Sequence, residues 1–159
     1  MTRKTVLGLL VPLLVVLHFF LHVGLSMEGS APDLLTLALL LAVRETGMGW
    51  GGAIGFFFGL LEDAFSVLAF GASSLAMVVI GILGSRTRDL FVGDSLLFSF
   101  VYLSSGKLLR DFIHWVVAGE VVRGPFLNTV LIDGGIAAVY MAAVGLFLVL
   151  ILGENRALQ

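Results

Sequence analysis

Four ionisable residues lie at helical spacing inside an otherwise apolar stretch of the chain. Lys107, Arg110, Asp111 and His114 follow i, i+3, i+4 and i+7, so on an α-helix they share one stripe. A charged side chain that faces hydrocarbon is costly unless it is paired or hydrated. The stripe is therefore expected to face protein or water. There it could form a structural ion-pair network, dock a partner helix, line an outward-opening pocket or relay protons.

Two adjacent acids interrupt another apolar stretch. Glu62 and Lys107 each lie 12 residues beyond the expected start of their helices, which is about 18 Å deep given the rise of an α-helix. We therefore expect Glu62 or Asp63 to pair with Lys107 or Arg110. Asp133, near the outer end of the last helix, is expected as a further neighbour of this intramembrane polar cluster.

The helix that carries these acids also has a face formed by glycines. Gly51, Gly55 and Gly59 form a doubled G-x-x-x-G pattern, which lets two helix backbones approach closely in a membrane. At about 100° per residue, Glu62 falls on the same face as the glycines. This face is expected either to pack against another helix of the chain or to dock a partner helix.

Signatures of catalysis and of metal binding are weak. The chain has no cysteine, which excludes disulfides, thiol catalysis and cysteine-based metal sites. His18 and His22 have i, i+4 spacing, but two histidines without a further ligand are better explained by packing. The sequence contains no nucleophile elbow, H-E-x-x-H motif or phosphate loop. We expect neither an enzyme nor a bound cofactor or metal.

Composition places the chain in a membrane. Hydrophobic residues make up 59% of the 159 residues and charged residues only 13%, whereas soluble domains have about 25% charged residues. So small a soluble chain could not cover this much apolar surface. The net charge of −2 gives no reason to expect nucleic acid as a partner. The expected class is an all-α membrane protein in contact with the lipid bilayer.

The apolar segments predict a single domain of six transmembrane helices. The first segment is expected to be a retained helix and not a cleaved signal peptide, and the second is short enough to be a half-helix or re-entrant segment. The expected spans are 5–27, 33–48, 50–68, 72–85, 95–117 and 129–152.

The distribution of basic residues predicts the orientation. In a six-span arrangement, one side of the membrane receives six basic residues, while the other side receives only Arg123. Because cytoplasmic loops are enriched in Lys and Arg, both termini are expected in the cytoplasm. The six residues are Arg3, Lys4, Arg44, Arg86, Arg88 and Arg156.

One block of the chain resembles a known family. It contains Pro32-Asp33-Leu34-Leu35, Arg44, Gly51-x-x-x-Gly55-x-x-x-Gly59-Leu60-Leu61-Glu62-Asp63, Phe70-Gly71 and Leu75-Ala76. This order resembles the rod-shape-determining membrane proteins of the MreD family, and the length and the number of spans agree. Asp63 matches the family's acid after the glycine helix, whereas Glu62 stands where an apolar residue is more usual.

The resemblance implies a function and a set of partners. The fold would be a six-helix bundle similar to the substrate-binding subunits of energy-coupling-factor vitamin transporters. The protein would be a non-catalytic scaffold in the bacterial cytoplasmic membrane that binds MreC, a bitopic protein with a periplasmic domain. It would help to couple MreB filaments to peptidoglycan synthesis by RodA and a penicillin-binding transpeptidase. The resemblance does not decide whether the chain forms a homodimer. The alternative function is that of a vitamin-binding transporter subunit.

Overall fold

A computed structural model describes residues 3–24, 32–66, 68–87, 95–120 and 123–157. This part of the chain is helical and contains no β-strand, as the composition predicts. Two of its helical stretches, Thr5–His22 and Leu127–Ile151, are long and apolar enough to cross a membrane. The elements are α1 (Arg3–Phe19), η1 (Phe20–Gly24), α2 (Leu34–Val43), α3 (Met48–Asp63), α4 (Ala72–Arg86), α5 (Leu96–Val117), η3 (Leu127–Asp133) and α6 (Gly134–Ala157), where η1 and η3 are π-helical.

The short helix α2 is the centre of the bundle. It contacts α1, α3, α4, α5 and α6, and all of its residues except Ala42 are buried. Its ten residues extend over about 15 Å, half of a hydrocarbon core that is about 30 Å thick. Because the other helices surround α2, its ends lie against protein, where unpaired backbone groups can find partners. The second apolar segment is thus a buried helix of half length.

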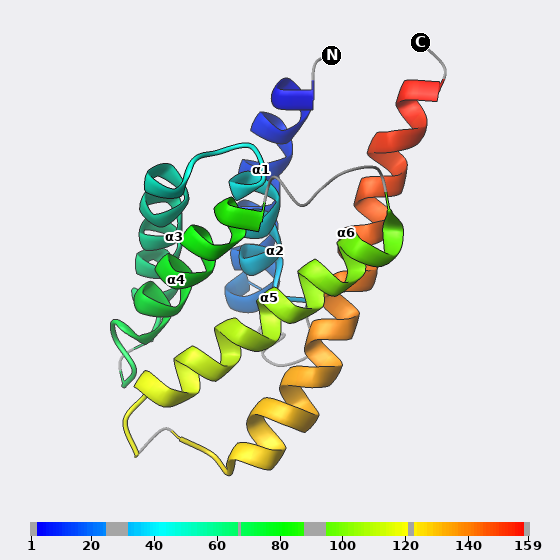
Figure 1. Ribbon diagram of the computed structural model, residues 1–159. Coiled ribbons are helices and arrows are strands. Elements are labelled where there is room, and N and C mark those ends of the chain that lie inside the picture. Colours follow the sequence, from blue (N-terminus) through cyan, green and yellow to red (C-terminus); the bar gives the residue numbers. More distant parts are fainter. Residues whose placement is uncertain (1–2, 25–31, 67, 88–94, 121–122, 158–159) are drawn as a thin grey trace.

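Successive helices run up and down, and both termini lie at the same end of the bundle (Figure 1). The α2–α3 connection also lies at this end, whereas the α3–α4 and α5–η3 connections lie at the opposite end. Arg44 follows α2 and Arg86 ends α4, so both belong to the end with the termini. Arg123 belongs to the α5–η3 connection at the opposite end. Arg88 and residues 25–27 of the first expected span lie outside the described residues.

Helices α3 and α4 pack closely through the glycine face. A Cβ atom on Gly51 would overlap Gly81 and Ser85 of α4, and one on Gly55 would overlap the backbone at Met77. A Cβ atom on Gly59 would lie 2.7 Å from the carbonyl oxygen of Ser73. The three glycines are buried in this contact, so α4 already occupies the face and leaves no room there for a partner helix.

Candidate functional site

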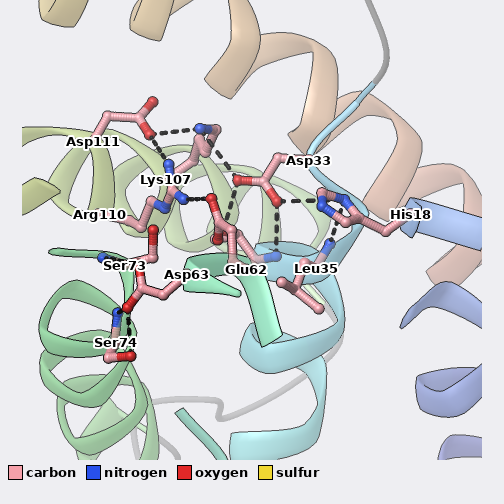
Figure 2. Close-up of polar contacts among 11 residues, drawn as sticks. His18, Asp33, Leu35, Glu62, Asp63, Ser73, Ser74, Lys107, Arg110 and Asp111 are labelled. Carbon is pink, nitrogen blue, oxygen red and sulfur yellow. Dashed lines mark hydrogen bonds and ion pairs between the residues drawn. The ribbon is translucent and has the colours of Figure 1, made fainter. Parts of the chain in front are cut away.

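Charged and polar side chains from four parts of the bundle meet beside the start of α2 (Figure 2). We call this group the polar network. Its ion pairs connect α5 to α3 and to the residue that precedes α2. Its members are His18, Asp33, Glu62, Lys107, Arg110 and Asp111.

Lys107 joins α5 to the start of α2. Its ammonium nitrogen lies 2.6 Å from Oδ1 of Asp111, one turn along α5, and 3.2 Å from Oδ2 of Asp33. The side chain of Lys107 is only 8% exposed. Two carboxylates therefore compensate the loss of hydration of this buried cation.

Arg110 joins α5 to α3. Its guanidinium group donates one hydrogen bond to Glu62 and another, of 3.0 Å, to Oδ1 of Asp111. Glu62–Arg110 is one of the pairs expected between the two adjacent acids and the two basic residues of α5. Nε of Arg110 and Oε2 of Glu62 are buried and make no hydrogen bond within the described part of the chain.

Asp63 does not pair with the cations of α5 and instead caps α4. Its carboxylate accepts hydrogen bonds from the backbone N–H groups of Ser73, at 3.1 Å, and Ser74, at 2.9 Å. The Ser74 hydroxyl donates a third bond, of 2.6 Å. Adjacent residues point about 100° apart on a helix, so Glu62 and Asp63 face different neighbours. The unpaired N–H groups at the start of α4 attract the carboxylate that faces them.

Two other expected members of the cluster lie at its edge or outside it. His114 is half-buried, one turn beyond Arg110 on α5. Asp133 is exposed at the end of η3, and within the described residues its side chain makes no hydrogen bond or ion pair with the polar network. The backbone of α6 approaches instead, because a Cβ atom on Gly134 would lie 3.4 Å from Oδ2 of Asp111. The π-helical form of η3 changes the register that a regular α-helix would give Asp133.

Asp33 is a network member that sequence reasoning did not place in the polar cluster. It does cap α2, because Oδ1 accepts a 2.9 Å hydrogen bond from the Thr36 N–H group and Oδ2 accepts a 2.7 Å bond from the Thr36 hydroxyl. The pairing with Lys107 depends on the depth at which α2 begins. The sequence feature that could have indicated this depth is the apolar segment after Asp33, which has only ten residues and is too short to cross the whole membrane.

His18 is the second residue that sequence reasoning missed. Its side chain is buried, and Nδ1 accepts a 3.3 Å hydrogen bond from the Leu35 N–H group. The same nitrogen lies 4.0 Å from Oδ1 of Asp33, and the His22 ring stacks on the His18 ring at 4.1 Å between centroids. His18 and His22 thus form a stacked pair beside Asp33. The described residues contain no group of three or more His, Cys, Asp or Glu that could hold a metal ion.

The network combines three carboxylates with one ammonium and one guanidinium group. Asp33, Glu62 and Asp111 supply the negative charges, and Lys107 and Arg110 the positive ones. Every one of these groups has a partner of opposite charge. The arrangement can fix the positions of α2, α3 and α5 relative to one another.

A shallow apolar groove that no residue of the polar network lines lies on the surface of η3 and α6. It is lined by Leu131, Ile132, Gly135, Ile136, Val139, Tyr140 and Ala143. Its lining offers few polar groups to orient a vitamin-like ligand.

Comparison of the chain with models of known protein families, with curated proteins and with solved structures gives no match.

Proposed function

We propose that this chain is a six-span protein of the bacterial cytoplasmic membrane, with both termini in the cytoplasm, that serves as a non-catalytic scaffold of the MreD kind. In this role it binds an MreC-like bitopic protein and helps to couple MreB filaments to peptidoglycan synthesis. RodA and a penicillin-binding transpeptidase are members of the same complex. The resemblance of residues 32–76 to the MreD family supports the family assignment.

The mutual pairing of the buried charges carries the proposal. Lys107 pairs with Asp33 and Asp111, and Arg110 pairs with Glu62 and Asp111. A substrate site needs convergent polar groups that are free to bind a ligand, whereas these groups bind one another. Such a network supports a rigid bundle that presents its outer surface to another protein.

The partner helix is expected on an outer face of the bundle and not on the glycine face. Helix α4 covers Gly51, Gly55 and Gly59. The outer faces of α1, α3 and α6 expose large apolar side chains, among them Leu13, Phe57 and Val139 at 61%, 60% and 55%. Any of these faces could contact a transmembrane helix of an MreC-like protein.

Affinity purification tests the function. The tagged chain is purified in mild detergent from its native membranes, and the proteins and small molecules that accompany it are identified by mass spectrometry. We expect a stoichiometric bitopic protein with a periplasmic domain. Recovery of a coupling membrane subunit with ATPases, or of a bound vitamin, would instead establish a transporter subunit and overturn the scaffold proposal.

Cysteine crosslinking then finds the contact face. Because the chain has no cysteine of its own, single variants Leu13→Cys, Phe57→Cys and Val139→Cys can each carry a photocrosslinker. The three sites are similarly exposed, so each variant is a control for the others. Crosslinking of the bitopic protein from one site alone identifies a specific face, whereas equal yields from all three indicate unspecific capture.

A further inference from the structure

His18 makes a buried polar contact between α1 and the centre of the bundle. Helix α1 packs mainly on α2, and only 11% of its apolar stretch is buried. His18 is the buried polar residue of α1, in the part of the helix whose side chains are described. Its contacts with Leu35 and Asp33 therefore link an exposed helix to the centre of the fold.

The hydrogen bonds define the protonation of both stacked histidines. Because Nδ1 of His18 accepts the Leu35 N–H bond at 3.3 Å, this nitrogen carries no proton and the neutral ring is protonated at Nε2. Nδ1 of His22 lies 3.0 Å from the carbonyl oxygen of His18, so His22 must carry its proton on Nδ1. The two adjacent histidines thus have opposite tautomers.

The surroundings of His18 contain an excess of negative charge. Burial of the side chain disfavours a positive charge on His18. Among the neighbouring groups, Asp33, 4.0 Å from Nδ1, and Glu62 of α3 favour this charge, whereas the stacked His22 and Arg110 of α5 oppose it. Lys107 already shares the other oxygen of Asp33. With three carboxylates against two cations, one additional proton makes the network neutral.

We propose that His18 and Asp33 form a binding site for a single proton. A hydronium ion transfers its proton to Nδ1 of His18, so that one O–H bond breaks and one N–H bond forms. The protonated nitrogen can no longer accept the Leu35 N–H bond and donates to Oδ1 of Asp33 instead. Proton binding thus moves the attachment of α1 from the α2 backbone to the Asp33 carboxylate.

Nuclear magnetic resonance of the full ¹⁵N-labelled chain in lipid nanodiscs tests the site. At the alkaline end of a titration between about pH 8 and pH 5, the ring nitrogens of His18 should show the Nε2-protonated tautomer and those of His22 the Nδ1-protonated tautomer. On acidification, the Leu35 amide should shift along a single-proton curve and lose protection from exchange, in step with the His18 ring. An Nδ1-protonated His18 at the alkaline end, or a Leu35 amide that does not respond, would overturn the proposal.

Two matched variants show whether His18 is the group that titrates. His18→Gln keeps a side-chain acceptor for the Leu35 N–H group but cannot take up a proton, so the Leu35 shift should be lost. His22→Gln removes the neighbouring imidazole and should retain the shift. A Leu35 amide that titrates in His18→Gln as in the parent chain would refute the site. The tautomer measurement on the unmodified chain decides the question if His18→Gln does not fold.

Discussion

Arg110 is the residue at which two parts of the polar network meet, since it binds Glu62 and Asp111 at once. Removing one partner from a buried ion pair leaves an uncompensated charge, which costs about 3–5 kcal/mol. Replacing both partners by apolar residues of similar volume costs much less. The net contribution of the Glu62–Arg110 pair to stability is therefore smaller than the free energy lost when only one partner is removed.

A double-mutant cycle separates the two quantities. We expect Arg110→Met alone to lower the free energy of unfolding by about 3–5 kcal/mol. Glu62→Met combined with Arg110→Met should lose less than the sum of the two single variants, with a coupling of about 0.5–3 kcal/mol. Unfolding in detergent, followed by circular dichroism, measures all four proteins. Additive losses would mean that the two side chains do not interact.

Asp63 allows a simpler prediction, because it is 1% exposed and accepts three hydrogen bonds. Asp63→Ala leaves the donors of Ser73 and Ser74 without an acceptor, so we expect a loss of at least about 2 kcal/mol in the free energy of unfolding. Asp133→Ala is the matched control, because it removes an exposed carboxylate. It should change stability by less than about 0.5 kcal/mol. Equal effects of the two variants would contradict the capping role of Asp63.

At the scale of the helices, close packing between α3 and α4 explains the glycine pattern. Gly55→Ala would place a methyl carbon 2.7 Å from the carbonyl carbon of Met77, which rigid backbone cannot accommodate without moving. We expect a loss of about 1–3 kcal/mol from overpacking. Gly8→Ala on α1 is the control, since nothing lies within 4 Å of its Cβ position. That variant should be neutral or stabilising, because alanine favours a helix.

The helical periodicity predicted which residues share a stripe but not which element meets it. The i, i+3 spacing predicted that Lys107 and Arg110 share one face of α5. Their distance from the start of the helix predicted that they lie at the level of Glu62 in the membrane. Lys107 nevertheless pairs with Asp33 and Asp111, because the short helix α2 begins deep inside the bundle. Asp133 was predicted beside the cluster but lies outside it for a similar reason, since it ends a π-helical segment that precedes α6. Both differences arise from tertiary packing and helix form, which the sequence pattern does not encode.

At the scale of the whole molecule, the exposed surface is consistent with the membrane class inferred from composition. Large apolar side chains cover the outer faces of the described helices, including Trp50 and Leu97 at more than 70% exposure. The charged residues of the polar network are turned inward. A protein with an apolar surface and charged residues in its interior is suited to a lipid bilayer.

The proposed topology makes a prediction about two connections. Gly47 lies between α2 and α3, and Glu120 lies between α5 and η3; both residues are exposed, and Figure 1 places these connections at opposite ends of the bundle. A cysteine at either position is the only thiol in the chain. If six helices cross the membrane with both termini inside, a membrane-impermeant thiol reagent added to spheroplasts should label Glu120→Cys. Gly47→Cys should react only after the membrane is permeabilised. Labelling of both sites from outside would refute the six-span arrangement, and the reversed pattern would place the termini outside, against the bias of the basic residues.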